Sequence, residues 1–175
     1  DNNQSYLLKG AIRMPTSKSD WFESLLFTIQ NKNFLSASLT NQNLIFKVES
    51  TEQLLKLSYP KNLKFKVDQS KLSDIRETLN GFYFYDVRKS KIKDLNNLPT
   101  LSFETKSGLI LSLSSVTQDK EGESWITIKA KAKKLGAKKI VDEITSKTIG
   151  YEFLANINTS DILRWNIQNL AEKNK

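Results

Sequence analysis

The stretch LSFETKSGLILSLSSVTQDKEGESWITIKA, residues 101–130, decides the fold that the sequence predicts. It contains three runs suited to strands, 101–106, 108–115 and 124–130, and the turns between them include Gly108 and Gly122. Glycine adopts the backbone conformations of tight turns without a steric penalty. The stretch therefore predicts an antiparallel meander of three strands.

Three more strands are expected before the meander. Residues 34–40 and 44–49 are joined by Asn41-Gln42-Asn43, and asparagine tolerates the positive φ that a hairpin turn requires. Residues 53–59 continue this pattern and end at Pro60, which cannot donate to a strand ladder. The segment 34–59 therefore predicts a second antiparallel meander.

The first residues predict a strand followed by a helix. The strand is expected at 6–13, and Ser17 is suited to cap a helix that ends near Asn31. Four apolar side chains recur at helical spacing and would form its buried face: Phe22, Leu25, Leu26 and Ile29.

A second strand–helix unit is predicted after Pro60. Apolar residues alternate with lysines over 63–67, which is typical of a half-buried strand. Asp68 is suited to cap the helix that follows, and Gly81 is placed to end it. We expect a strand at 82–87 and a loop at 88–99, and the buried face of the helix should contain Leu72, Ile75 and Leu79.

The chain closes with a third unit, in which we expect a helix at 138–147 and a strand at 151–155. Asn158 or Thr159 would cap a C-terminal helix with Leu163, Ile167 and Leu170 facing inward. Isolated helices between strand-rich segments predict an α+β fold with mainly antiparallel sheets. We place a boundary near Pro60, which divides the chain into two α+β subdomains, 1–59 and 60–175.

The composition argues against most catalytic centres. The 175 residues include no Cys and no His, which excludes disulfides, Cys/His zinc sites, Ser-His-Asp triads and cysteine nucleophiles. The six glycines form no phosphate-binding loop. The acidic pairs Asp142-Glu143 and Glu121/Glu123 are better explained as surface charges. We therefore expect no enzymatic activity, no cofactor and no metal ion.

The most distinctive local feature is a basic run over 129–139. The chain carries 27 basic and 19 acidic residues, a formal net charge of +8. Six lysines fall within these eleven residues, which contain no acidic residue: Lys129, Lys131, Lys133, Lys134, Lys138 and Lys139. They are a candidate interaction surface for anionic lipid head groups, an acidic partner or a nucleic-acid backbone. The alternative is that they keep an exposed strand edge from pairing with another chain.

The strand expected at 82–87 begins with four aromatic residues, Phe82, Tyr83, Phe84 and Tyr85. Because neighbouring residues of a strand face opposite sides, two of them could stack on bases of a single strand. Packing into a core is the more frequent reason for such a pattern. Only four of the basic residues are Arg, whereas sequence-specific readers of nucleic acids rely on Arg.

The sequence contains no apolar run long enough to cross a membrane as a helix. Its first residues, Asp1-Asn2-Asn3-Gln4-Ser5, do not resemble a signal peptide. Because the chain begins with Asp rather than Met, we expect it to be a processed or truncated product from which a targeting or anchoring segment has been removed.

Three segments carry a resemblance to a known family. They are Tyr59-Pro60 with 67–81, FETKSGL at 103–109 with WITI at 125–128, and IGYEF at 149–153 with Ile162, Leu163 and Leu170. Over about residues 59–172 the chain resembles a bacterial family of membrane-anchored domains of unknown function, found beside ABC transporters of the gliding-motility type. It departs from the family at Ala155-Asn156-Ile157, which lacks an expected proline, and at Ser107, where an acidic residue is expected.

This resemblance implies an extracytoplasmic domain, tethered to a membrane through a segment absent from this chain. It also implies a protein partner, such as an ABC-type membrane complex. Our first hypothesis is therefore a non-enzymatic interaction or accessory domain whose lysines contact an anionic membrane surface or an acidic partner. The alternative is a cytoplasmic nucleic-acid-binding module that uses Lys129–Lys139 and the aromatic strand. A third option, a carboxylate-based hydrolase, would need Asp142 or Glu143 in a deep pocket.

Overall fold

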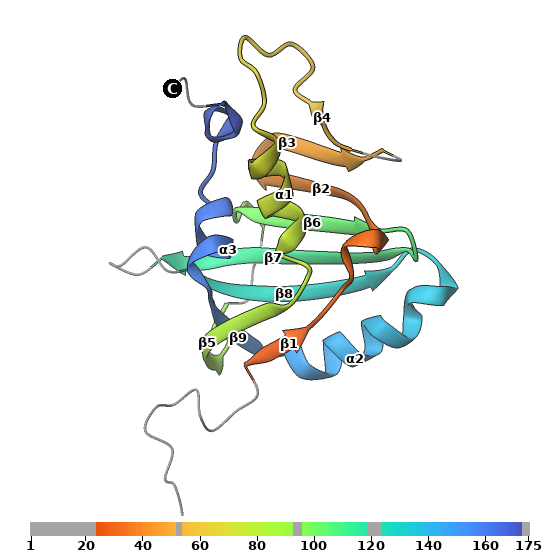
Figure 1. Cartoon of the computed structure of the whole chain (residues 1–175). Coiled ribbons are helices and arrows are strands. Elements are labelled where there is room, and N and C mark those ends of the chain that lie inside the picture. Colours follow the sequence, from red (N-terminus) through yellow and green to blue (C-terminus); the bar gives the residue numbers. More distant parts are fainter. Residues whose placement is uncertain (1–23, 52–53, 93–95, 119–123, 173–175) are drawn as a thin grey trace, which may run out of the picture.

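The computed structural model describes residues 24–51, 54–92, 96–118 and 124–172. In this part of the chain, nine strands form one antiparallel sheet with the order β1-β5-β9-β8-β7-β6-β2-β3-β4 (Figure 1). The strands are β1 (Leu25–Phe27), β2 (Phe34–Asn41), β3 (Asn43–Ser50), β4 (Leu55–Tyr59), β5 (Phe82–Lys89), β6 (Thr100–Thr105), β7 (Leu109–Gln118), β8 (Ser124–Ala132) and β9 (Tyr151–Ala155). The helices are α1 (Gln69–Glu77), α2 (Lys138–Thr148) and α3 (Ile157–Ile162), with short 3-10 turns η2 (Asn31–Asn33), η3 (Leu135–Ala137) and η4 (Ile167–Leu170).

The meander predicted at 101–130 is confirmed as β6, β7 and β8. Phe103 lies opposite Leu111, and Leu113 lies opposite Ile128, so their apolar side chains share one face of the sheet. Gly108 occupies the turn between β6 and β7 with a φ of +88°, a conformation that side chains with a Cβ rarely adopt. The second predicted turn, at 119–122, lies outside the described residues. The α+β class with a mainly antiparallel sheet is therefore confirmed.

The sheet continues across the boundary expected near Pro60. Strand β2 from the first part of the chain pairs with β6 from the second, and β1 pairs with β5. Because these pairs join both parts in one sheet, no break in the described strands marks the two subdomains 1–59 and 60–175. That division stays a prediction.

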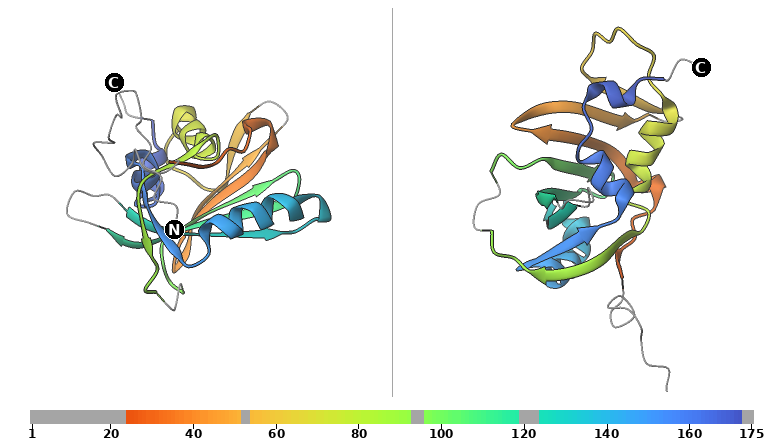
Figure 2. Two further views of the ribbon diagram at one scale, coloured as in Figure 1. Left: turned by 90° about the horizontal axis from the view of Figure 1, so that it is seen from below. Right: turned by 90° about the vertical axis from the view of Figure 1, so that its left-hand side faces the viewer.

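Helices α1 and α3 lie on the same side of the sheet (Figures 1 and 2). Asp68 caps α1, as predicted, by accepting a hydrogen bond from the N–H of Ser70 at 2.8 Å. Leu72 and Ile75 are fully buried in the core, and the pattern that predicted them is the helical spacing of apolar residues. Helix α2 runs alongside β8 and contributes Ile144 to the same core (Figure 1).

The helix predicted between Ser17 and Asn31 is wrong for the residues that the structure describes. Leu25–Phe27 form strand β1, whose Leu25 lies opposite Tyr83 of β5. The N–H of Ile29 donates to the carbonyl of Leu79 at 2.8 Å, which ties the segment to the end of α1. A short apolar run fits either a helix or a buried strand, and here the neighbouring strand decides. Ser17, Phe22 and the strand predicted at 6–13 lie outside the described residues.

The strand predicted at 63–67 is also wrong. Its apolar side chains are partly buried, but only Val67 pairs, in an isolated bridge with Ala171. The alternation therefore predicted correctly which side chains are partly buried. It did not predict a strand correctly, because no neighbouring strand pairs with this segment along its length.

The last predicted helix is divided in two. Asn156 caps α3, which ends at Ile162, and Asn166 caps the separate turn η4. The expected caps Asn158 and Thr159 lie inside α3. Two competing asparagine caps therefore split one apolar pattern into two short elements.

Candidate functional site

The six lysines of the predicted interaction surface are all exposed, but they do not form one patch. Lys129 and Lys131 belong to β8 and face the same side of it, because they are two residues apart on a strand. The others lie where the chain leaves β8, turns through η3 and enters α2: Lys133, Lys134, Lys138 and Lys139. The basic run therefore divides into two lysines on strand β8 and four lysines around the turn between β8 and α2.

We call the turn at residues 133–139 the basic tip. At its centre stands Leu135, whose side chain is 92% exposed. Gly136 follows it, and apart from its neighbours along the chain no atom lies within 4 Å of the position that a Cβ would occupy there. The basic tip therefore presents an uncovered leucine between two pairs of lysines.

Two lysines of the basic tip have contacts within the protein. Lys133 Nζ lies 2.7 Å from Oε1 of Glu104 on β6, and Lys134 Nζ donates to the carbonyl of Lys106 at 3.1 Å. Both contacts hold the tip against the turn between β6 and β7. By contrast, no described carboxylate forms an ion pair with Lys129, Lys131, Lys138 or Lys139.

The face of the sheet that carries Lys129 is rich in hydroxyl groups. In the registered strands, Lys129 lies opposite Ser112, Ser112 opposite Ser102, and Ser102 opposite Ser38. The hydroxyls of Ser102 and Ser112 are 3.1 Å apart. Most apolar side chains of these strands lie on the opposite face, whereas Ile110 lies opposite Lys131 on the hydroxyl face. The serines of this face are available for polar contacts.

A cavity of about 610 Å³ opens between β8, the C-terminal end of α2 and the start of β9. We call it the β8–α2 pocket. Lys129 and Lys131 line it, and no carboxylate does among the residues that the structure describes. The remaining lining residues are neither acidic nor basic residue types: Ser90, Ile92, Asn96, Thr127, Ile128, Ala130, Thr145, Thr148, Ile149, Gly150 and Tyr151.

Thr127 is an unusual member of this lining. The residue is 8% exposed, and its hydroxyl has no hydrogen-bond partner in the structure. A buried hydroxyl without a partner costs free energy, so nearly all such groups in proteins are satisfied. Thr127 faces the same side of β8 as Lys129 and Lys131, because the three residues are spaced two apart on a strand, and all three line the β8–α2 pocket.

Glu152 of β9 holds Ser90, one of the residues that line the β8–α2 pocket, in place. Its carboxylate accepts hydrogen bonds from Arg88 Nε at 2.7 Å, from Ser90 Oγ at 2.9 Å and from the N–H of Lys91 at 3.2 Å. Burial raises the pKa of Glu152, but the hydrogen bonds from Arg88, Ser90 and Lys91 and the charge of Arg88 outweigh it, so the net pKa is lowered. Glu152 is therefore a charged, internally paired carboxylate.

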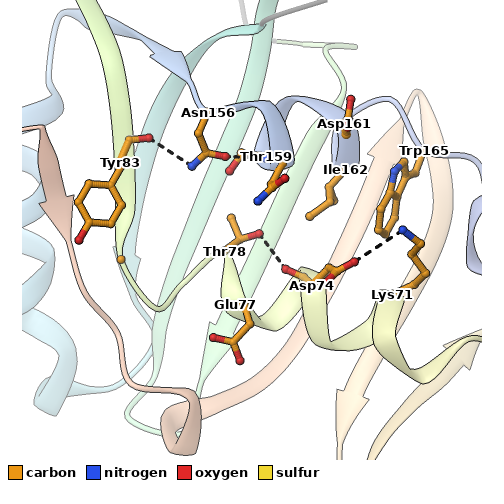
Figure 3. Close-up of a pocket in the computed structure, with 12 residues that line it drawn as sticks. Lys71, Asp74, Glu77, Thr78, Tyr83, Asn156, Thr159, Asp161, Ile162 and Trp165 are labelled. Carbon is orange, nitrogen blue, oxygen red and sulfur yellow. Dashed lines mark hydrogen bonds and ion pairs between the residues drawn. The ribbon is translucent and has the colours of Figure 1, made fainter. Parts of the chain in front are cut away.

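A second cavity, of about 350 Å³, lies between α1 and α3 (Figure 3). Lys71 and Asp74 come from α1, and the Lys71 ammonium lies 3.7 Å from Asp74 and 5.3 Å from the ring centre of Trp165. Asn156 donates to the carbonyl of Tyr83 at 3.4 Å. Figure 3 shows Lys71 and Thr78 turned toward Asp74, and Asn156 turned toward Tyr83. These polar groups of the cavity are therefore already paired within the protein.

The aromatic strand serves mainly the core. Phe82 is buried and stacks on Phe27 with ring centres 5.2 Å apart, and Phe84 meets Phe153 edge to face at 5.0 Å. Tyr83 and Tyr85 alternate with them and are about half exposed. Core packing thus explains one side of the strand, and the base-stacking hypothesis is left with the two tyrosines.

The carboxylates singled out in the sequence do not converge. Asp142 and Glu143 are exposed on α2, and neither lines the β8–α2 pocket or the cavity between α1 and α3. Glu121 and Glu123 lie outside the described residues. The hydrolase option therefore gains no support from these positions.

Sequence reasoning missed most of the β8–α2 pocket. Its residues come from three separate segments, and only the alternation Thr127, Lys129, Lys131 within β8 was visible in the sequence. No local pattern places the end of α2 or Ser90 beside that strand.

None of the described helices combines the length and the apolar character needed to span a bilayer. Searches of protein-family models, of curated proteins and of solved structures gave no match to the chain. The resemblance to the membrane-anchored family therefore stays a prediction, and the functional argument rests on the geometry above.

Proposed function

We propose that this chain is a non-enzymatic interaction domain that contacts an anionic membrane surface through its basic tip. The observation that carries the proposal is Leu135, which is 92% exposed between Lys133 and Lys134 on one side and Lys138 and Lys139 on the other. An apolar side chain that enters the interface, surrounded by lysines that meet anionic head groups, is the chemistry of peripheral membrane binding.

Both parts of the tip contribute to this binding. A lysine near an anionic leaflet contributes about 1 kcal/mol, and this contribution falls with salt because the charges are screened. Lys138 and Lys139 have no ion pair with a described carboxylate to give up on binding. Leu135 already exposes its side chain to water, so its burial in the interface removes apolar surface from water at no cost to the protein core.

The extracytoplasmic location, the membrane tether and the association with an ABC-type membrane complex belong to the same proposal, and the family resemblance supports them. A tip that lies on the bilayer would orient the domain beside its complex. Recovery of transporter subunits with the wild-type domain in a crosslinking pull-down from native membranes would support this part. Recovery of nucleic acid with its usual proteins would contradict it and favour the nucleic-acid-binding alternative.

The direct test measures binding to vesicles of phosphatidylglycerol and phosphatidylcholine by co-sedimentation. Wild type should bind, and binding should weaken as salt is raised. The variant Lys138→Gln/Lys139→Gln should bind about tenfold to thirtyfold more weakly at low salt, from about 1 kcal/mol per lysine. Leu135→Gln should weaken binding severalfold even at high salt, because its contribution does not depend on charge.

Matched control variants make the test specific. Lys61→Gln/Lys64→Gln removes the same charge from two exposed lysines elsewhere, and Leu54→Gln removes another leucine that is 68% exposed. Both controls should bind vesicles nearly as wild type does. Equal losses in the tip and control variants would show that only net charge matters and would refute the tip. Tighter binding to a single-stranded oligonucleotide than to vesicles would support the alternative.

A further inference from the structure

The β8–α2 pocket is separate from the basic tip in both residues and chemistry. Its lining includes Lys129 and Lys131 but none of the residues 133–139. Its volume of about 610 Å³ is within the range of small-molecule sites, which is about 300–1,000 Å³. The membrane contact proposed for the basic tip therefore does not account for a ligand in this pocket.

The charges around the pocket favour an anion. Two lysines line it, and neither forms an ion pair with a described carboxylate. The nearby Glu152 is 1% exposed, and its carboxylate already accepts hydrogen bonds from Arg88, Ser90 and Lys91. The C-terminal end of α2 contributes a partial negative charge of about half a unit, which is smaller than the two full charges of the lysines.

The buried hydroxyl of Thr127 supplies a second and independent observation. Thr127 lines the pocket, the residue is more than nine-tenths buried, and its hydroxyl has no hydrogen-bond partner. A hydroxyl can donate to an anionic oxygen, and such charge-assisted hydrogen bonds are stronger than neutral ones. An anion held by Lys129 and Lys131 would give this hydroxyl the partner that it lacks.

The rest of the lining is suited to an apolar group. Ile149 is 70% exposed and Ile92 is partly exposed, and both line the pocket. Isoleucine side chains left open to water at the rim of a pocket gain by contact with an apolar ligand. An inorganic ion alone would leave this part of the pocket unused.

We infer that the β8–α2 pocket binds a small amphiphilic anion, with a phosphate or carboxylate head at Lys129, Lys131 and Thr127 and a short apolar part against Ile92 and Ile149. The inference does not depend on the membrane contact of the basic tip. Phosphate and carboxylate heads share the chemistry that the pocket recognises, and the source can be a lipid or a soluble metabolite.

Isothermal titration calorimetry with four probes tests the site in the whole chain: hexyl phosphate, hexanoate, inorganic phosphate and hexanol. The wild type should bind hexyl phosphate or hexanoate saturably at one site. Inorganic phosphate should bind at least several times more weakly, because it makes no apolar contact, and hexanol should not bind measurably. Hexanol bound as tightly as hexyl phosphate, or no saturable binding to any probe, would overturn the proposal.

A fifth probe, a short-chain phosphatidic acid added below its micellar concentration, distinguishes a lipid ligand from a soluble one. Tighter binding of this molecule than of hexyl phosphate would assign the site to a lipid head group. Equal or weaker binding would assign it to a soluble anion. Both results presuppose the saturable site measured with the first probes.

Variants separate the pocket from the tip. Lys129→Gln/Lys131→Gln should lower the affinity for hexyl phosphate at least tenfold, and Thr127→Val, which replaces the hydroxyl by a methyl group, about threefold to tenfold. The control Lys138→Gln/Lys139→Gln removes the same charge from the tip and should change the affinity less than twofold. Equal losses in the two lysine pairs would mean that long-range charge, and not a built site, attracts the anion.

The two proposals fail in different experiments. Loss of vesicle binding in the tip variants with intact hexyl phosphate binding would leave the pocket standing, and the reverse result would leave only the tip. Thr127→Val should also unfold at a slightly higher urea concentration than the wild type, because it removes a buried hydroxyl without a partner. A clear loss of stability in that variant would show that the hydroxyl has a structural role instead.

Discussion

Replacing Glu152 by Gln should remove one of the strongest polar contacts of the fold. The Glu152 side chain is 2% exposed, and its carboxylate accepts three hydrogen bonds, from Arg88, Ser90 and Lys91. These bonds attach the end of β5 and the residues after it to β9. The substitution keeps the size of the side chain, so its effect reports on charge and hydrogen bonding rather than on packing.

The expected loss in the free energy of unfolding is about 2–3 kcal/mol. A hydrogen bond to a charged group contributes about 1.5–3 kcal/mol, and breaking a buried ion pair costs about 3–5 kcal/mol. The loss lies below that upper range for two reasons. The Arg88 side chain is 42% exposed, so water can solvate its charge, and glutamine keeps one oxygen that accepts from Ser90 or Lys91.

The difference between wild type and Glu152→Gln should depend on pH in one direction. The pKa of Glu152 is lower in the folded protein than in the unfolded chain, where a glutamate has a pKa of about 4.3. The carboxylate therefore stabilises the fold fully above about pH 5, and this stabilisation is lost as the pH falls through the folded pKa. Other carboxyl groups titrate in both proteins and cancel in the difference.

Urea denaturation, with the slope and the midpoint fitted at each pH, measures this difference. Glu172→Gln is the matched control, since Glu172 forms an exposed ion pair with Lys66 at 2.9 Å and should contribute no more than about 1 kcal/mol. If Glu152→Gln lost no more stability than this control at neutral pH, the buried network would not contribute as argued. A difference that persisted unchanged in acid would show that the charge of Glu152 is not its source.

Two further substitutions test the turns and caps. Gly108→Ala should lower the free energy of unfolding by about 2 kcal/mol or more, because φ is +88° and the new Cβ would lie 2.7 Å from Cβ of Lys134. The control Gly136→Ala has open space for its Cβ and should be near neutral, both variants being measured by urea denaturation. Asn156→Ala should cost about 1 kcal/mol by removing the cap of α3, and the neighbouring Asn158→Ala should cost much less; equal effects would contradict the assignment of the cap.

Local patterns predicted the fold wherever one short-range signal acted alone. The cap Asp68 and the helical spacing of Leu72 and Ile75 gave α1, and the glycine at 108 gave the turn between β6 and β7. The prediction failed at Leu25–Phe27, where the same apolar residues fit a helix face and a buried strand equally well. There the pairing with β5, distant in the sequence, decides the outcome.

The β8–α2 pocket could not be predicted for the same reason. Its cationic groups follow from the alternation of Lys129 and Lys131 along one strand, which the sequence shows. Its shape depends on where β8 and β9 separate. These strands pair only at Trp125 and Ile126 of β8, and the end of α2 lies beside the rest of β8. That separation is a property of the whole sheet, and no spacing of residue types encodes it.

The position of β8 also bears on why Lys129 and Lys131 are lysines. Lysine on an exposed edge strand prevents pairing with another chain, and the sequence alone allowed that explanation. In the described sheet the terminal strands are β1 and β4, while β8 lies between β9 and β7. Where β9 no longer pairs with β8, α2 runs alongside it (Figure 1). Because a helix already covers that edge, protection of the edge does not account for these two lysines, and the anion-binding explanation gains by comparison.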